Sequence, residues 1–174
     1  ETSSLDPHQA DLVGISLCHK IGKACYIPIG HNSEKCINKD LVLKKLKPLL
    51  EDSSIKKIGQ NIKFDFIVLF KHGITISTME DTMLMSYVLD AGKNRHNMDS
   101  LSEIHLNHKT IAFKDLVGTG KKEINFKDVN LEKAKDYAAE DADITFRLYK
   151  IFSKKLKLEK LLNIYEVFEK PLIK

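Results

Sequence analysis

Tryptophan is absent from this 174-residue chain, and cysteine, proline and arginine are scarce. The three cysteines, Cys18, Cys25 and Cys36, show no CxxC spacing, which excludes a disulfide framework and a cysteine-based zinc site. They indicate reduced thiols in a cytosolic protein. No apolar run approaches the roughly 20 residues that a membrane-spanning helix needs, and no signal-peptide pattern opens the chain. The net charge of +4 permits an anionic partner without requiring one.

The composition that remains is that of an ordinary globular domain. Hydrophobic residues make up 43% and charged residues 30%, and 174 residues are about the length of one domain. Of the 28 lysine and arginine residues only Arg95 and Arg147 are arginine, so each is a candidate for a contact that needs the forked guanidinium. The chain begins with Glu1, and its last amphipathic stretch runs into Pro171 without a stop signal. We therefore expect it to be part of a longer protein.

Short apolar segments alternate with helical patterns along the chain, which predicts an α/β fold with a mixed sheet flanked by helices. A β-hairpin is expected over 11–29 with its turn at 20–23, and further strands are expected over 55–59 and 74–77. Residues 107–129 have weak periodicity, which indicates a loop-rich excursion.

Helix signals are clearest where a capping residue precedes an apolar periodicity. Ser100 and Glu103 form a capping box for a short helix ending at 106. Pro48 should disturb the last turn of the first helix. The expected longer helices and their candidate N-caps are 40–49 after Asn38 or Asp40, 62–71 after Asn61, 81–89 at Asp81, and 131–157 after Asn130.

A carboxylate interrupts the apolar face of the longest predicted helix. Asp141 lies in the middle of that face, one turn after Tyr137. Asp136 and Asp143 fall on the opposite face and are expected to be solvated and inert. An ionised carboxylate on a core-facing stripe is costly unless a metal, another cation or hydrogen bonds compensate it. For Asp141 alone, a structural hydrogen-bonding role and a functional site weigh equally.

Asp65 repeats this pattern in the predicted helix over 62–71, which is apolar nearly all round and should be buried. An acidic residue in a first helical turn also complements the helix dipole, so this residue alone has a structural explanation. Two carboxylates on apolar helices of one small domain favour a shared site, because clustered carboxylates repel one another unless a hard divalent cation binds them.

Three short motifs follow one another in the chain: Glu1-Thr-Ser-Ser-Leu-Asp6, Gly59-Gln-Asn-Ile-Lys-Phe-Asp65 and Tyr137-Ala-Ala-Glu-Asp141. They resemble the end of Asp-x-Glu-Thr, then Asn-x-x-x-Asp and Tyr-x-x-x-Asp. These are the motifs of the 3′–5′ proofreading exonuclease domain of bacterial DNA polymerase I, a family A polymerase whose exonuclease is DnaQ-like and RNase H-like. Blocks at 81–89, 95–101 and 165–172 extend the resemblance over essentially the whole chain. Three motifs in order are far more specific than any one.

The resemblance implies an RNase H-like fold, with a mixed sheet flanked by helices and the carboxylates meeting at one edge. It also implies two-metal-ion hydrolysis that removes nucleotides from DNA 3′ ends. By resemblance, Glu1 and Asp141 ligate the metal ion that activates the attacking water, and Asp65 serves the second ion. The Tyr137 hydroxyl is expected to orient the water. The expected ions are Mg²⁺ or Mn²⁺, with Zn²⁺ as an alternative at one site.

Residues implied to contact the DNA strand are carried over position by position. Leu5 matches an apolar wedge against the terminal base, with Phe113 as its partner on the loop-rich segment. Phe64 stands where relatives often carry tyrosine, whereas the seven histidines and Arg147 match no functional position. The remaining implied strand contacts, together with Phe64, are Thr2, Gln60, Asn61 and Arg95.

The same resemblance makes residues 1–174 one exonuclease domain of a longer polymerase. The first-motif aspartate and its strand should lie upstream of Glu1, and a polymerase domain should follow downstream. The implied partner is a single-stranded or frayed DNA 3′ end, bound by a monomer without membrane contact in the bacterial cytoplasm, at the nucleoid. Two alternatives stay open: an RNase D-like RNA 3′ exonuclease, and a catalytically inactive module that binds DNA or acts as a structural spacer.

Overall fold

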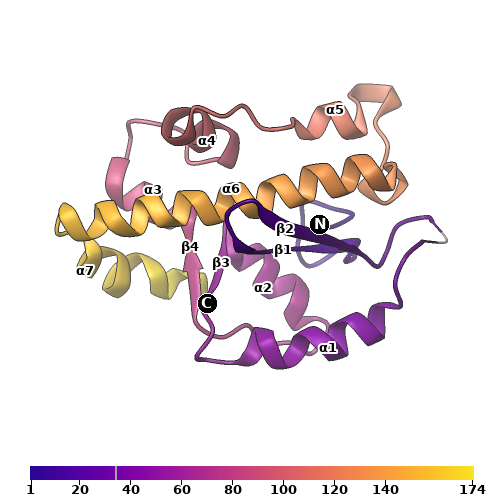
Figure 1. The fold of residues 1–174 in the computed structure, drawn as a ribbon, viewed down its shortest axis with the longest axis horizontal. Helices are drawn as coiled ribbons and strands as arrows, with labels where there is room; N and C mark the ends of the chain where they lie inside the picture. The colour runs from indigo at the N-terminus through magenta and orange to yellow at the C-terminus, as the bar shows by residue number, and fades with distance from the viewer. Residues whose placement is uncertain (34) are drawn as a thin grey trace.

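One long helix, α6 (Leu131–Leu158), organises the fold in the computed structural model, which describes residues 1–33 and 35–174 (Figure 1). The Asn130 side chain caps α6 by accepting the backbone N–H groups of Glu132 at 3.0 Å and Lys133 at 3.4 Å. α6 packs against both strands of the hairpin and against helices on its other side. As the periodicity predicts, its buried apolar residues include Ala134, Ala138, Ile144, Leu148 and Phe152.

The described strands form two two-stranded sheets rather than the one mixed sheet expected. β1 (Gly14–Lys20) and β2 (Lys23–Pro28) make the predicted antiparallel hairpin. β3 (Lys57–Gly59) and β4 (Met79–Asp81) pair in parallel. Both pairings of a mixed sheet are present, but in the described part of the chain neither pair hydrogen-bonds to the other.

The start of the chain extends the hairpin on the edge of β1 opposite to β2. Thr2 pairs antiparallel with Leu12, and the Glu1 carbonyl accepts the N–H of Val13 at 2.9 Å and of Gly14 at 3.2 Å. This segment takes up backbone hydrogen-bonding groups of Val13 and Gly14 at the beginning of β1. It also fixes where the Glu1 side chain leaves the backbone.

Residues 74–77 form no strand, which corrects the sequence prediction. Ile74 and Ile76 are only 1% and 3% exposed, so their alternation reflects the packing of an extended segment on the core. The pairing strand comes slightly later, as β4, and leads directly into α3 (Thr82–Asp90). Asp81 is the N-cap of α3, as predicted.

Two further helices differ from prediction at one end. α1 (Lys39–Glu51) is capped by the Asn38 side chain but continues past Pro48 to Glu51. α4 (Met98–Leu106) begins before Ser100, so Ser100 lies inside the helix and the predicted capping box is wrong. The local signals at Pro48 and Ser100 therefore do not set the ends of these helices.

The other elements form layers on the two sides of α6. α4 and α5 (Phe113–Val117) lie on one side of it, and the strands, α1 and α2 (Ile62–Phe70) lie on the other (Figure 1). Residues 107–129 hold α5 and two 3₁₀ turns, Gly120–Lys122 and Phe126–Asp128. None of the helices in the described ranges has the length and apolar character needed to cross a bilayer.

The chain ends beside β4. After α7 (Leu162–Ile164) come a π-helical turn, Tyr165–Glu169, and a 3₁₀ turn, Lys170–Ile173. Tyr165 is fully buried and packs with α6 residues such as Leu156 in the same hydrophobic cluster. This C-terminal segment therefore belongs to the core of the fold.

Candidate active site

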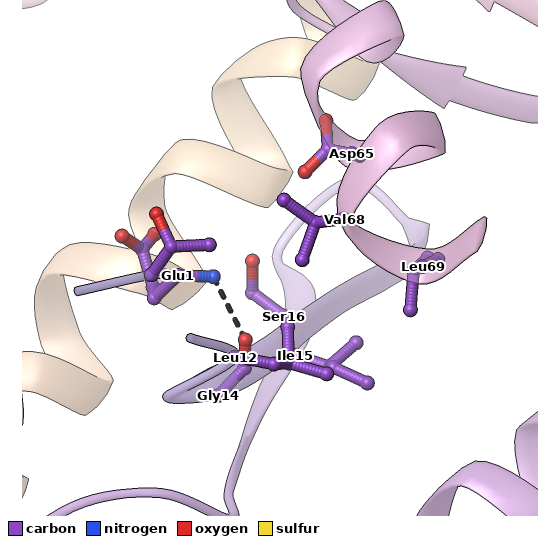
Figure 2. A pocket seen from close by; sticks show the side chains of 9 residues that line it. Glu1, Leu12, Gly14, Ile15, Ser16, Asp65, Val68 and Leu69 are labelled. Carbon is purple, nitrogen blue, oxygen red and sulfur yellow. Dashed lines mark hydrogen bonds between the residues drawn. The ribbon is translucent and has the colours of Figure 1, made fainter. Parts of the chain in front are cut away.

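An open recess lies between the start of the chain, β1 and α2 (Figure 2). Glu1 enters it from the segment paired with β1, and Asp65 enters it from the first turns of α2. Figure 2 shows both carboxylates on the side of the recess that faces the ribbon of α6. The full lining consists of Glu1, Thr2, Leu12, Gly14, Ile15, Ser16, Asp65, Val68 and Leu69.

Asp141 and Tyr137 complete the group from α6. Burial raises the pKa of Asp141 from 3.8 to about 8, the negative charge of Glu1 adds to the rise, and interaction with Tyr137 opposes it. Burial also raises the pKa of Tyr137, with Asp141 and then Glu1 contributing. Glu1 therefore lies close enough to act electrostatically on both α6 residues.

Asp65 is exposed to solvent in the recess, so the expectation that it is buried is wrong. α2 buries only Ile62, Val68 and Leu69, and Phe70 is 60% exposed, because one side of this apolar helix faces outward. Protein nevertheless surrounds the Asp65 carboxylate in the recess. Loss of bulk solvent raises its pKa to about 6, and the charges of Glu1 and Asp81 contribute to the rise.

Among the described residues, no lysine or arginine side chain forms an ion pair with Glu1, Asp65 or Asp141. Within the same ranges, no group of three or more His, Cys, Asp or Glu side chains lies close enough together to hold one metal ion. The carboxylates therefore lie near one another without converging on a single metal position, as expected of like charges that repel one another.

The predicted strand contacts divide into those near the recess and those set apart from it. Thr2 lines the recess, and its hydroxyl donates to the Ser4 carbonyl at 3.0 Å. Leu5 is 94% exposed, as an apolar wedge must be before it meets a base. Phe113 is partly exposed, with its ring centroid 6.0 Å from that of Tyr137.

Four other predicted contacts lie around the start of α2 and in the loop before α4. Asn61 and Arg95 are exposed, whereas Phe64 is half-buried against the core. The Gln60 amide is already engaged: its Nε2 donates to the His96 carbonyl at 2.8 Å, and its Oε1 accepts from Thr82. Gln60 therefore holds the loop that carries Arg95, in place of offering a free amide.

Asp143 and Arg147 have roles that the helical wheel did not predict. The Asp143 carboxylate accepts the Gly22 N–H at 2.6 Å and pairs with the Arg147 guanidinium at 2.7 Å. It fastens the β1–β2 turn to α6, so the prediction that it is solvated and inert is wrong. The turn folds over a helix face that looks solvent-exposed when α6 is considered alone.

His31 lies in the loop that follows β2 and is buried there. It is only 7% exposed, and its Nε2 lies 2.6 Å from the Tyr26 hydroxyl. Sequence reasoning also missed Asp99 and Glu140, whose charges raise the pKa of Asp141. Glu140 precedes Asp141 directly, and Asp99 lies in the 95–101 block, which was the available signal.

The family model described as 3′–5′ exonuclease matches residues 1–157. The chain belongs to the 3′–5′ exonuclease family. The exonuclease domain is 41% identical over 194 residues to DNA polymerase I of Rhizobium leguminosarum, a match that covers 99% of this chain and 19% of that protein. It is 42% identical over 180 residues to DNA polymerase I of Pseudomonas aeruginosa, with 99% and 20% covered. The exonuclease domain thus spans about a fifth of the length of these relatives.

Solved structures share the fold of the exonuclease domain at lower identity. Pol1 of M. smegmatis, solved as its POL domain in complex with DNA primer-template and dNTP, superposes with a TM-score of 0.72 at 17% identity, covering 97% of this chain and 25% of that one. Brucella melitensis NrnC superposes with a TM-score of 0.70 at 24% identity, covering 92% and 72%. A structure of NrnC with bound Mg²⁺ gives 0.68 at 24% identity, with the same coverage. The predicted RNase H-like α/β class is confirmed.

Proposed function

We propose that this exonuclease domain removes nucleotides one at a time from DNA 3′ ends with two divalent metal ions, as the proofreading part of a longer polymerase. The observation that carries the proposal is the convergence of Glu1, Asp65 and Asp141 on one neighbourhood beside Tyr137. A structural cluster of carboxylates would be neutralised by lysine or arginine, whereas this one retains raised carboxyl pKa values, which suits a site that binds cations.

The donor set fits Mg²⁺ or Mn²⁺, because carboxylate oxygens are the ligands that these hard ions prefer. In this proposal Glu1 and Asp141 hold one ion and Asp65 serves the other. This division needs no group of three carboxylates around a single ion. We propose that the first-motif aspartate lies upstream of Glu1 in the longer protein, where it would add a further carboxylate to this donor set. When bound, the ions would activate a water and neutralise charge on the attacking and leaving oxygens.

The reaction is hydrolysis of the last phosphodiester. The water oxygen bonds to phosphorus, and the bond from phosphorus to the 3′ oxygen of the preceding nucleotide breaks. That 3′ oxygen takes up a proton, and a nucleoside 5′-monophosphate leaves. Tyr137 holds its proton at neutral pH because burial raises its pKa, so its hydroxyl is able to orient the water without becoming charged.

The residues around the site suit a single strand of any sequence. Leu5 and Phe113 offer apolar surfaces for base stacking, and Arg95 offers a guanidinium to a phosphate. Thr2 and Asn61 lie at the recess and at the start of α2, where a backbone could pass. The site in this proposal therefore recognises an unpaired 3′ end and not a base sequence.

The test is excision from 3′-labelled single-stranded DNA by the longer protein, without deoxynucleotides, in Mg²⁺ or Mn²⁺ and in chelator. We expect Asp141→Ala to reduce the rate by at least 1,000-fold, since a buried metal ligand is lost, and Tyr137→Phe to reduce it by about 10²–10⁴-fold. Asp136→Ala is the matched control on the same helix, because Asp136 is 65% exposed. It should retain activity within about two- to three-fold.

Equal losses in Asp141→Ala and Asp136→Ala would contradict the assignment of the site to one face of α6. An RNA strand of the same sequence separates the RNase D-like alternative, since faster cleavage of RNA than of DNA would favour it. If a folded protein leaves the labelled 3′ end uncut in both Mg²⁺ and Mn²⁺, the result would favour the alternative of a catalytically inactive module.

A further inference from the structure

The Asp81 carboxylate caps two helices at once. Asp81 is only 1% exposed. Its Oδ1 accepts the N–H of Met83 at 2.9 Å and of Leu84 at 3.4 Å, in the first turn of α3. Across the fold, Oδ1 also accepts the N–H of Asn61 at 3.1 Å, and Oδ2 accepts the N–H of Ile62 at 3.0 Å. One buried side chain thus joins the starts of α2 and α3.

α2 depends on this contact because it has no cap of its own. Asn61 adopts the left-handed conformation with φ 59°, and its side chain makes no capping hydrogen bond. The first N–H groups of a helix have no partner within the helix, and burial without an acceptor costs about 1–3 kcal/mol for each group. Asp65 lies in the first turn of α2, so the position of the helix start fixes where its carboxylate enters the recess.

The C-terminal segment contacts the backbone of Asp81 and the side chain of its neighbour Glu80. The Tyr165 hydroxyl accepts the Asp81 N–H at 3.0 Å and donates to Glu80 Oε2 at 2.9 Å. Glu80 is 3% exposed and also binds Lys170 at 2.9 Å and Lys56 at 3.2 Å. These buried polar groups all have partners, and a fully satisfied buried network makes the backbone around it rigid.

We propose that Asp81, held in place by Tyr165, is a positioning residue for Asp65. The inference rests on the proposed function, in which Asp65 serves a metal ion. Three contacts connect the two residues. The Tyr165 hydroxyl binds the Asp81 backbone, and the Asp81 carboxylate binds the first N–H groups of α2. The first turn of α2 then carries Asp65. Partners that orient a metal ligand in this way commonly change metal affinity or activity by about 10–100-fold when they are altered.

Two substitutions in the longer protein test this path. Asp81→Asn keeps one acceptor oxygen but replaces the other by an NH₂ group, which cannot accept from Ile62 while the remaining oxygen caps α3. Tyr165→Phe keeps the buried ring and removes only the hydroxyl. We expect the Mn²⁺ dissociation constant, measured by calorimetric titration without DNA, to rise about 10-fold in Asp81→Asn and about 3-fold in Tyr165→Phe. We expect the excision kcat to fall in the same order, with KM for the strand within about two-fold.

Leu156→Ala is the matched control. Leu156 is fully buried in the same cluster as Tyr165 but makes no hydrogen bond to this path. It should lower the melting temperature by more than Tyr165→Phe while leaving Mn²⁺ affinity unchanged. Hydrogen exchange gives a readout without metal: the amides of residues 61–66 should exchange at least 10-fold faster in Asp81→Asn, and should be unaltered in Leu156→Ala at a temperature where both are folded.

The possible results distinguish the positioning role of Asp81 from the proposed function. Normal Mn²⁺ affinity and normal exchange at 61–66 in both network variants, with an active parent protein, would overturn the positioning role and leave the proposed function intact. An equal loss of Mn²⁺ affinity in Leu156→Ala would also overturn it, because general stability would then be the cause. A folded parent protein that neither binds Mn²⁺ nor excises would overturn the proposed function, and the positioning role with it.

Discussion

Replacement of Asp141 by asparagine is expected to stabilise the metal-free chain at alkaline pH, although it removes a ligand of the proposed site. The pKa of Asp141 is raised from 3.8 to about 8 in the folded chain, first by burial and then by the charge of Glu1. A carboxyl whose folded pKa lies above its unfolded pKa favours folding as the neutral acid. Its contribution to stability is complete below about pH 4 and is lost as the pH rises through about 8.

The magnitude follows from the same values. At roughly 1.4 kcal/mol for each pKa unit, the distance from 3.8 to about 8 sets a ceiling of about 6 kcal/mol on the destabilisation by the ionised group. Asp141 keeps partial contact with solvent and its neighbours relax, so we expect about 1–3 kcal/mol to be realised. For a chain of this length, that corresponds to about 3–10 °C in melting temperature.

The assay is thermal unfolding of the 174-residue chain in chelator at several pH values between 5 and 9, with Asp136→Asn as the matched control. Asp141→Asn should melt close to the wild type at pH 5 and above it at pH 9, and added Mn²⁺ should raise the melting temperature of the wild type more than that of the variant. A variant that melts below the wild type at pH 9 would show that Asp141 has a stabilising partner, and the reasoning from burial would be refuted.

Three further predictions concern other parts of the molecule. Gly14→Ala should cost about 1–3 kcal/mol in urea unfolding, because the new Cβ would meet the Tyr26 hydroxyl at 2.1 Å; an unchanged midpoint would mean that Tyr26 moves away freely. Asp143→Ala should cost about 0.5–1.5 kcal/mol by the same measurement, because the hydrogen bonds to the Gly22 N–H and to Arg147 are lost; an unchanged midpoint would show that Asp143 does not hold the turn. Arg95→Ala should raise KM for the single strand about 3–10-fold and reduce its salt dependence with kcat little changed, whereas a fall in kcat alone would place Arg95 in the chemical step.

Local signals in the sequence were sufficient to predict the longer helices and the two site residues on α6, Tyr137 and Asp141. Asn130 lies directly before α6, and the spacing of Tyr137 and Asp141 follows from helical geometry, so both could be predicted without knowledge of the fold. Asp81 as the cap of α3 is equally local, since its partners follow within three residues. The order of three motifs then identified the family, which the match over residues 1–157 confirms.

The contacts that could not be predicted join segments far apart in the chain. Asp143 looks solvated on a wheel of α6, but the β1–β2 turn covers it through the Gly22 N–H. The second role of Asp81, at the start of α2, links positions about twenty residues apart and leaves no local pattern. The alternation at Ile74 and Ile76 records burial on the core, which a period of two does not distinguish from strand pairing.

The position of α6 late in the chain bears on when the site is completed during synthesis. The hairpin of β1 and β2 and the pairing of Thr2 with Leu12 join near neighbours in sequence, so they close small loops and form early. Tyr137 and Asp141 arrive much later on a ribosome, and Tyr165 later still. A nascent chain can therefore build its hairpin before any carboxylate of α6 is present. The repulsion between Asp141 and Glu1 then arises only when α6 packs against the segments that precede it.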